Sequence, residues 1–290
     1  MKLIALDMDG TVLTSDKRVT EETIQAIRDA KAAGHLVMIC SGRAHSALIP
    51  YLEEQGLSGL PVSGSNGAVS CVDGEIIHQV KMDRAVVAQL FDWLDVNQYP
   101  FKLYTRIGTF GKAGYVELTK SEFELAQDEI SKTPLRPGVH RVTIEFAEQY
   151  EKKYPTAIIG SLDEIATDNE IFKIFVYTPR ATKKQAFKAF LETLPNITVT
   201  SSYDDNIEVM AANGHKGTGL AQIAKYYNIP IENTIAIGDN FNDIQMLEVA
   251  GLSIAMENAE EKVKEICDVT TLTNDEDGVA HAIREYILKS

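Results

Sequence analysis

The chain contains only three cysteines, Cys40, Cys71 and Cys267, among 290 residues. They are too few and too widely spaced for a disulfide framework or a zinc cluster, so we interpret them as reduced core residues. No apolar run approaches the ~18 residues that a membrane-spanning helix needs. Asp7 and Asp9 interrupt the first apolar stretch too early for the hydrophobic segment of a signal peptide. The sequence therefore predicts a cytoplasmic protein with no membrane anchor.

The chain also has fewer basic than acidic residues: 28 lysines and arginines against 42 aspartates and glutamates, which gives a net charge of −14. This balance, together with the lack of a basic run, argues against nucleic acid or an anionic membrane as the main partner. An anionic substrate would need a local positive site that acts against the overall field. The content of 44% hydrophobic and 24% charged residues is typical of a globular chain, and its length favours two domains.

Buried strands alternate with amphipathic helices at both ends of the chain. Four apolar residues precede Asp7, which suits a strand that is covered on both faces, and Thr20 can cap the helix that follows. The predicted elements are strands at 3–7, 36–40, 234–238 and 252–255, and helices at 20–34, 217–227 and 242–251. Strand, helix, strand implies a right-handed parallel unit. We therefore predict an α/β fold in which both ends build one doubly wound, Rossmann-like parallel sheet.

The middle of the chain has a different pattern. A predicted helix around Trp93 is followed by several strands of alternating polarity and a helix at 181–194. This pattern indicates an α+β insertion. We therefore predict a core of residues 1–81 and 213–290 and an inserted domain of residues 82–212.

Polar residues gather where predicted core strands end. In an open parallel sheet, ligands bind beyond the carboxyl ends of the strands, where the loops converge. The candidates are Asp7, Asp9 and Thr11 after the first strand, Ser41, Gly42 and Arg43 after the second, Asp239, Asn242 and Asp243 after 234–238, and Lys216 at the start of its helix.

Each candidate also has a plain structural interpretation. Ser41 equally suits a helix N-cap, and Asn66 with Gly67 equally suits an ordinary turn. Helix caps or solvated surface positions would likewise account for Arg43, Lys216, Asp239 and Asp243. The roles of His45 and His215, which lie near the same loops, stay open.

Together the loops indicate metal-assisted phosphoryl transfer. Carboxylates at 7, 9, 239 and 243 form a predicted cluster that needs a hard divalent cation, and oxygen-only ligation suits Mg²⁺. Ser41, the Gly42 amide and Lys216 supply donors and positive charge for an anion beside that metal. A metal, a phosphate cradle and a free carboxylate nucleophile specify this reaction class.

These motifs resemble those of the haloacid dehalogenase superfamily, and within it the Cof-type phosphatases that carry a large C2B cap. The segments DMDGT, SGR, SNGA, HKGTGL, GDNFND, AMENA and TNDEDGVA occur in the family's order over almost the whole chain. One departure is Glu257, where the family more often has glycine.

The resemblance implies a role for each candidate. Asp7 would be the nucleophile, Asp9 the general acid and then the base, and Lys216 would offset the charge of Asp7. The implied Mg²⁺ ligands are the Asp7 carboxylate, the Asp9 backbone carbonyl and Asp239, with Asp243 orienting them. The implied phosphate or substrate contacts are Thr11, Ser41, Gly42, Arg43, Asn66, Gly67 and Asn242. The inserted domain would be a cap that reads a small phosphorylated metabolite, such as a sugar phosphate, flavin mononucleotide or pyridoxal phosphate.

Two alternatives use the same acceptor aspartate. A phosphomutase or phosphotransferase would deliver the phosphoryl group to a second hydroxyl. A phospho-receiver regulatory module would keep it without turnover, but such a module needs no acid/base two residues after the acceptor, and its single small domain leaves the insertion unexplained. We expect a monomer or a weak homo-oligomer.

Overall fold

The computed structural model describes residues 1–132, 151–202 and 204–289. These residues form two compact units, one of 1–79 with 215–289 and the other of 80–132 with 151–214. The predicted boundaries, 81/82 and 212/213, each lie two residues from these divisions. Among the described helices, none is long and apolar enough to cross a bilayer.

The first unit contains an eight-stranded sheet in the order β14-β13-β12-β1-β2-β3-β4-β5. Its strands are β1 (Leu3–Asp7), β2 (Leu36–Cys40), β3 (Val62–Gly64), β4 (Val69–Val72), β5 (Glu75–Gln79), β12 (Thr234–Gly238), β13 (Leu252–Ala255) and β14 (Val269–Thr270). All neighbours from β14 to β3 are parallel, whereas β4 and β5 add an antiparallel edge. The doubly wound parallel sheet predicted from both chain ends is therefore confirmed.

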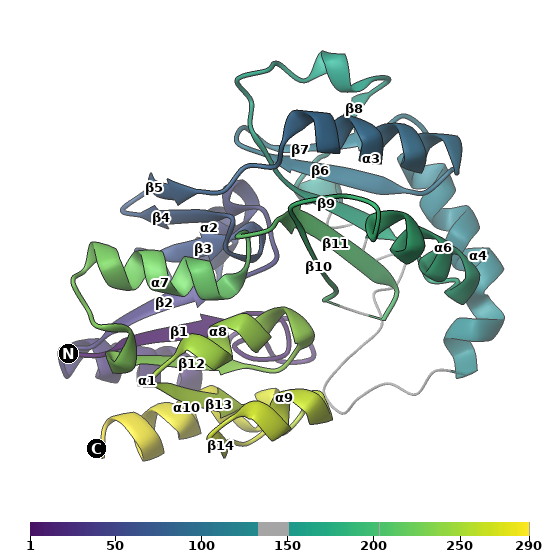
Figure 1. The fold of residues 1–290 in the computed structure, drawn as a ribbon. Coiled ribbons are helices and arrows are strands. Elements are labelled where there is room, and N and C mark those ends of the chain that lie inside the picture. Colours follow the sequence, from purple (N-terminus) through teal and green to yellow (C-terminus); the bar gives the residue numbers. More distant parts are fainter. Residues whose placement is uncertain (133–150, 203, 290) are drawn as a thin grey trace. The chain divides into compact units, whose positions relative to one another are not determined.

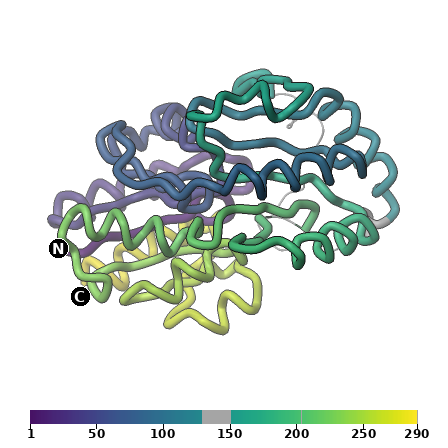
Figure 2. The backbone as a smooth tube through the Cα atoms, turned by 45° about the horizontal axis from the view of Figure 1, so that its top comes forward, coloured from purple at the N-terminus to yellow at the C-terminus, as the bar shows by residue number. Residues whose placement is uncertain are grey.

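Strand β1 is central because it pairs with β2 on one side and β12 on the other (Figures 1 and 2). Its four apolar residues are completely buried, which explains why the run carries no polar alternation. The pairing places the ends of strands from the first and last thirds of the chain side by side in the middle of the sheet.

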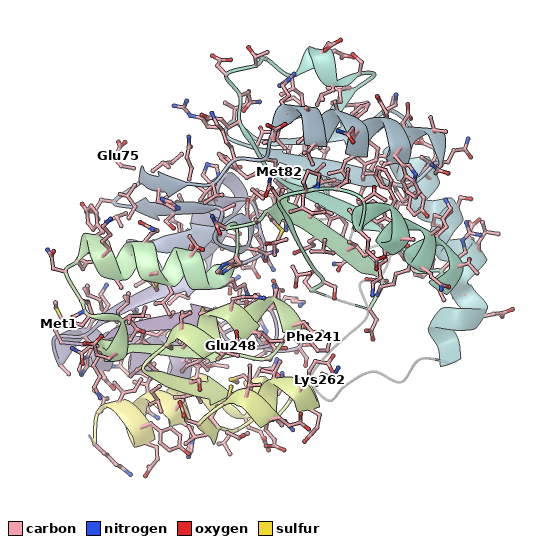
Figure 3. The ribbon with its side chains drawn as sticks, in the orientation of Figure 1. Met1, Glu75, Met82, Phe241, Glu248 and Lys262 are labelled. Carbon is pink, nitrogen blue, oxygen red and sulfur yellow. The ribbon has the colours of Figure 1, made fainter. Side chains whose placement is uncertain are left out.

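Helices cover both faces of this sheet. Helices α7 and α8 pack together on one face, and α1 packs against α10 on the other (Figure 1). The helices are α1 (Glu21–Ala32), α2 (His45–Glu54), α7 (Lys216–Tyr226), α8 (Ile244–Val249), α9 (Glu261–Ile266) and α10 (Gly278–Ala282). Met246 and Leu247 of α8 are buried, while Glu248 is exposed (Figure 3). The predicted cap of α1 is confirmed, since Thr20 Oγ1 accepts a hydrogen bond from the Thr23 amide at 3.1 Å.

The helix after β2 begins later than a Ser41 cap would require. Helix α2 starts at His45 with Ala44 as its N-cap residue, and Ser41 Oγ instead accepts a 3.2 Å hydrogen bond from the Arg43 amide. The N-cap interpretation of Ser41 is therefore wrong. Helix α8 is also shorter than predicted, because a 3₁₀ turn, Phe241–Asp243, precedes it.

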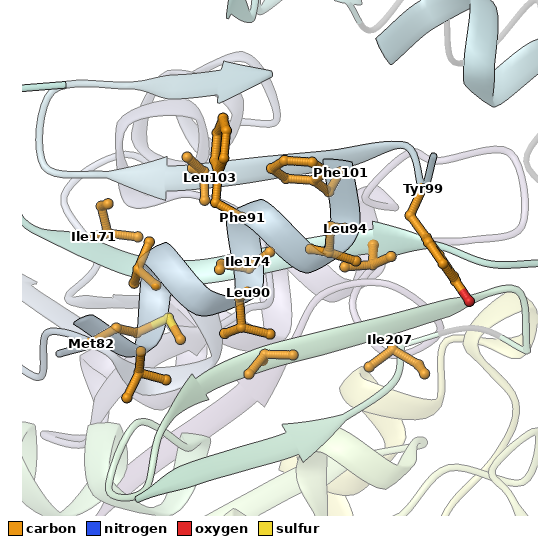
Figure 4. Close-up of a cluster of buried hydrophobic side chains, with 14 of the residues drawn as sticks. Met82, Leu90, Phe91, Leu94, Tyr99, Phe101, Leu103, Ile171, Ile174 and Ile207 are labelled. Atoms are coloured by element: carbon orange, nitrogen blue, oxygen red, sulfur yellow. The ribbon is translucent and has the colours of Figure 1, made fainter. Parts of the chain in front are cut away.

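The second unit has a six-stranded sheet in the order β10-β11-β9-β6-β7-β8, antiparallel except for the last pair. Its strands are β6 (Phe101–Thr105), β7 (Thr109–Lys112), β8 (Ala157–Ile159), β9 (Ile171–Tyr177), β10 (Ile197–Thr200) and β11 (Asn206–Ala211), and its helices are α3 (Arg84–Val96), α4 (Tyr115–Lys132) and α6 (Ala181–Leu191). Leu90, Phe91 and Leu94 of α3 pack onto the sheet residues Phe101 and Ile174 (Figure 4). Trp93, the only tryptophan, stacks on Phe190 of α6 with ring centroids 4.6 Å apart.

A buried ion pair also joins two strands of the second unit. Lys173 of β9 lies 3.1 Å from Glu208 of β11, and their side chains are only 1% and 3% exposed. The Lys173 ammonium sits 4.4 Å from the Tyr104 ring centroid, and Ser202 Oγ donates to the Glu208 carboxylate at 3.1 Å. Each charge in the pair is thus compensated inside the protein.

Candidate active site

The site begins where β1 ends. Asp7 is the last residue of β1 and is in register with Cys40, the last residue of the adjacent strand β2. On the other side β12 ends at Gly238, so Asp239 is the first residue beyond that strand. Because parallel strands end at a shared edge, residues far apart in the chain meet here.

Three carboxylates and one ammonium form the centre of the site. Asp7, Asp239 and Asp243 are buried, and each offers an oxygen within 4.8 Å of the others. Lys216, which is completely buried at the start of α7, places its Nζ 2.5 Å from an oxygen of Asp7 and 2.5 Å from an oxygen of Asp243. The other Asp243 oxygen accepts hydrogen bonds from the amides of residues 239 and 240 at 3.0 Å. Asp243 therefore also holds the loop that carries Asp239.

The charges in this cluster do not balance within the protein. Three carboxylates face a single ammonium, which leaves a formal charge of −2 in a buried place. Burial, reinforced by Asp243, raises the pKa of Asp7 to about 7 against the opposing effect of Lys216. Burial lowers the pKa of Lys216, but Asp243 and Asp7 outweigh burial and keep that pKa above its usual value. Hard oxygen donors with surplus negative charge fit a divalent cation.

The Asp9 side chain is not part of this cluster. Its carboxylate accepts two hydrogen bonds from Arg43, at 3.0 and 3.1 Å, and one from Lys17 at 2.9 Å. These cations outweigh the effect of burial and hold the pKa of Asp9 well below its usual range. The predicted four-carboxylate cluster is thus corrected to three, because β1 ends at Asp7 and the turn that follows points Asp9 elsewhere.

The remaining predicted contacts lie around the same strand ends. Thr11 Oγ1 donates to Asp239 at 3.1 Å, and Asn242 Nδ2 donates to the Asn66 side-chain oxygen at 3.2 Å. The Ser41 and Asn66 loops are joined directly, since the Asn66 amide donates to the Ser41 carbonyl at 2.9 Å. Ser41, Asn66 and Asn242 therefore come from three loops of one local network.

Gly67 allows a close approach that places Lys216. It has φ +93°, and a Cβ atom there would lie 2.1 Å from the His215 carbonyl oxygen. The His215 ring caps α7, with Nδ1 accepting from the Thr218 amide at 3.3 Å. His215 thus has a structural contact next to Lys216, and His45 is the buried first residue of α2.

Sequence reasoning missed two asparagines that support the loop after β1. Asn258 Nδ2 donates to the Gly10 carbonyl, and Asn274 Nδ2 donates to the Leu13 carbonyl, both at 2.8 Å. They belong to the segments AMENA and TNDEDGVA, which were recognised as motifs without a physical role. Glu257 is not among the non-glycine residues with positive φ, so this backbone does not require the glycine that is more usual in the family.

Cys40 and Cys71 are buried core residues, as predicted, whereas Cys267 is only half-buried. Burial raises the pKa of the Cys40 thiol to about 12 and that of the Cys71 thiol to about 11. A thiol with such a pKa stays protonated near neutral pH and is a poor nucleophile. Asp7 is therefore the stronger candidate for the nucleophile at this strand end.

Comparison with known proteins identifies the family. The model of the haloacid dehalogenase-like hydrolases matches residues 4–283. The chain belongs to the haloacid dehalogenase-like hydrolase family. The enzyme is 32% identical to phosphatase YwpJ of Bacillus subtilis, with 99% of this chain and 100% of the relative covered. It is 30% identical to the 5-amino-6-(5-phospho-D-ribitylamino)uracil phosphatase YwtE of B. subtilis, with 99% and 98% covered.

Solved structures confirm the predicted fold of this hydrolase. A haloacid dehalogenase-like hydrolase from B. subtilis matches with a TM-score of 0.85 at 32% identity, covering 99% of this chain and 100% of the other. A subclass IIB sugar phosphatase of the superfamily matches with a TM-score of 0.77 at 22% identity, covering 99% of both chains, which supports the fold alone. Phosphatases of this family generally use a divalent metal, and the cluster of Asp7, Asp239 and Asp243 suits one.

Proposed function

We propose that this hydrolase is a Mg²⁺-dependent phosphatase that acts on small phosphomonoesters through an aspartyl phosphate on Asp7. The observation that carries the proposal is the position of Asp7 at the end of β1, 2.5 Å from the Lys216 ammonium and beside Asp239 and Asp243. A carboxylate next to a cation site and a fixed ammonium meets the requirements for nucleophilic attack on phosphorus.

Asp7 and Asp239 would hold Mg²⁺ by their carboxylates, together with the Asp9 backbone carbonyl. Asp243 would orient the site through its hydrogen bonds to Lys216 and to the loop that carries Asp239. When bound, the ion supplies charge stabilisation for the transferring phosphoryl group. The surplus of two negative charges in the donor set is the physical reason for expecting it.

The protein residues divide the reaction into two steps. In the first step an Asp7 oxygen forms a bond to phosphorus, the ester P–O bond breaks, and Asp9 gives a proton to the departing alcohol. In the second step the Asp9 carboxylate takes a proton from water, whose oxygen attacks phosphorus while the Asp7–phosphorus bond breaks. Ser41, the Gly42 amide, Lys216 and Asn242 would hold the phosphoryl oxygens, and Thr11 positions Asp239. In the arrangement seen, Arg43 and Lys17 hold Asp9 as a carboxylate, so its protonation for the first step would require Arg43, one of the implied substrate contacts, to leave it while Lys17 stays.

The second unit would act as the cap that reads the organic group of the substrate. Its sheet carries the buried ion pair of Lys173 and Glu208, with the half-buried Tyr104 ring beside it. The relatives support a small ester, since YwtE is named for a phosphorylated ribitylaminouracil. The substrate class we propose is a sugar phosphate or the phosphate of a cofactor or its precursor, with no polymer bound.

The proposal is tested by hydrolysis of p-nitrophenyl phosphate before and after exhaustive chelation, with Mg²⁺ added back. We expect chelation to abolish turnover and Mg²⁺ to restore it. Asp7→Asn should be inactive because an amide cannot form the acyl phosphate, whereas Asp16→Asn, a change at an exposed aspartate in the turn after β1, should be fully active. Full activity of the chelated enzyme or of Asp7→Asn would contradict the mechanism.

The substrate class requires a separate experiment. Release of inorganic phosphate is measured across sugar, nucleotide and cofactor phosphates and phosphoproteins, and the substrates are ranked by kcat/KM. A small ester should rank first. A preference for phosphoprotein would contradict the substrate class, and transfer to a second hydroxyl without release of phosphate would favour a phosphotransferase.

A further inference from the structure

Two cations from different segments hold the Asp9 carboxylate. Arg43 lies in the loop after β2 and binds both oxygens, through Nε at 3.1 Å and a terminal nitrogen at 3.0 Å. Lys17 comes from the turn after β1 and places Nζ 2.9 Å from one of these oxygens. A carboxylate held from two sides has little freedom to rotate, so its position is set by where Arg43 and Lys17 stand.

The Lys17 backbone is held in an uncommon conformation. Its φ is +59°, in the left-handed region that favours glycine. The Lys17 amide donates to the Thr14 carbonyl, and the Thr14 amide donates to the Arg18 carbonyl, both at 2.9 Å. A non-glycine residue persists in this region when its surroundings impose it, and such positions cluster at functional sites. The turn thus directs the Lys17 side chain back to Asp9.

Tyr51 of α2 links the two cations. The Arg43 guanidinium lies 4.2 Å from the centroid of the Tyr51 ring. The Tyr51 hydroxyl donates to the Lys17 carbonyl at 3.1 Å. The Tyr51 side chain therefore packs against Arg43 and also holds the turn that carries Lys17.

We infer that Lys17 and Tyr51 are positioning residues for the acid/base step, with Arg43 as the cation that they support. This inference rests on the proposed function, because it concerns how Asp9 is presented to the leaving group. A purely structural role fits less well, since Lys17 and Asp9 are each 26% exposed and partly exposed ion pairs add little to stability. Their arrangement matters where a displacement of about 1 Å is costly, as in proton transfer.

The test compares two esters of similar shape, p-nitrophenyl phosphate and phenyl phosphate. Phenolate is the poorer leaving group and depends more on a positioned acid. Lys17→Met should lower kcat/KM for phenyl phosphate about tenfold more than for p-nitrophenyl phosphate. Lys17→Arg, which keeps a cation, should restore the wild-type ratio in part. Tyr51→Leu, which removes both of its contacts, should shift the ratio in the same direction as Lys17→Met.

Two controls separate positioning from other effects. Arg18→Met removes an exposed cation from the same turn, with its side chain 74% exposed, and should leave both rates unchanged. In an Asp9→Asn background, Lys17→Met should cause no further loss, because its effect passes through Asp9.

The outcomes distinguish the inference from the proposed function. Equal losses on both esters, or an undiminished effect of Lys17→Met in the Asp9→Asn background, would overturn the positioning role. A Tyr51→Leu variant with a wild-type ratio would overturn the role of Tyr51. If the wild-type enzyme released phosphate from neither ester, or if Asp9→Asn were fully active on both, the proposed function itself would fail.

Discussion

Replacing Lys173 with methionine should strongly destabilise the second unit. The substitution keeps most of the side-chain volume but removes the ammonium that pairs with Glu208, whose side chain is 3% exposed. Removal of one partner from a buried ion pair typically costs about 3–5 kcal/mol, because the remaining charge is buried without compensation. Ser202 still donates one hydrogen bond to Glu208, but a hydroxyl does not replace a charge.

The assay is urea unfolding followed by Trp93 fluorescence. This tryptophan is the only one in the chain, and its stacking on Phe190 makes it a reporter of the second unit. With an m-value of about 2 kcal/mol/M, the loss of about 3–5 kcal/mol lowers the midpoint by about 1.5–2.5 M urea. Lys188→Met, an exposed lysine of α6, should shift it by no more than about 0.25 M.

A second variant identifies the cause of that loss. Lys173→Met combined with Glu208→Met removes both charges and should recover most of the midpoint, since an apolar pair can replace a buried ion pair. A single variant that unfolds within about 0.25 M of the wild type would refute the reasoning. A double variant no more stable than the single one would show that packing, and not the uncompensated charge, dominates.

Two further predictions concern a carboxylate of the second unit and a glycine of the site. Burial raises the pKa of Glu122, but bonds from Arg180 and Lys183 outweigh it and keep the pKa below its usual value. Glu122→Gln should therefore lower the free energy of unfolding by about 1–2 kcal/mol at pH 6. This difference should vanish as the pH falls below about 4.3 and through the folded-state pKa of Glu122. Unfolding followed by Trp93 fluorescence that shows the same difference at pH 3 would contradict this. Gly10→Ala would place Cβ 2.5 Å from an Asp239 oxygen, so the Mg²⁺ concentration for half-maximal activity should rise about 10- to 100-fold. Gly34→Ala, with positive φ but no atom within 4 Å, is its control, and equal effects of the two would exclude the clash as the cause.

The sequence was sufficient to predict the sheet and the residues at its edge. Buried parallel strands are recognisable as short apolar runs, and ligands bind beyond their carboxyl ends, so Asp7, Asp239 and Lys216 could be brought together without coordinates. A surplus of negative charge at this edge was also predictable from the residue types, but its size was not, because Asp9 lies outside the cluster.

The direction of side chains in the turns was not predictable. Residues two apart face the same side only within a strand. Because β1 ends at Asp7, the direction of the Asp9 side chain could not be inferred from that of Asp7. Lys17, the partner of Asp9, reaches it through a left-handed backbone position that no local pattern marks. Asn258 and Asn274 act on carbonyls about 250 residues away in sequence, at Gly10 and Leu13, and such contacts are fixed by tertiary packing alone.

The central place of β1 has a consequence for synthesis of the chain. Asp7 leaves the ribosome before the second unit, yet its neighbouring strand β12 ends at residue 238. The second unit lies between these two segments in the sequence, so it is complete in the nascent chain before β1 has both partners. In ribosome-bound chains that end at residue 230 and carry an added linker long enough to span the exit tunnel, we expect the second unit but not β1 to be protected from protease. Protection of β1 should appear only in chains that also contain β12. Protection of β1 in the shorter chain would contradict this order, in which the nucleophile is made before the second unit and its pocket is completed after that unit.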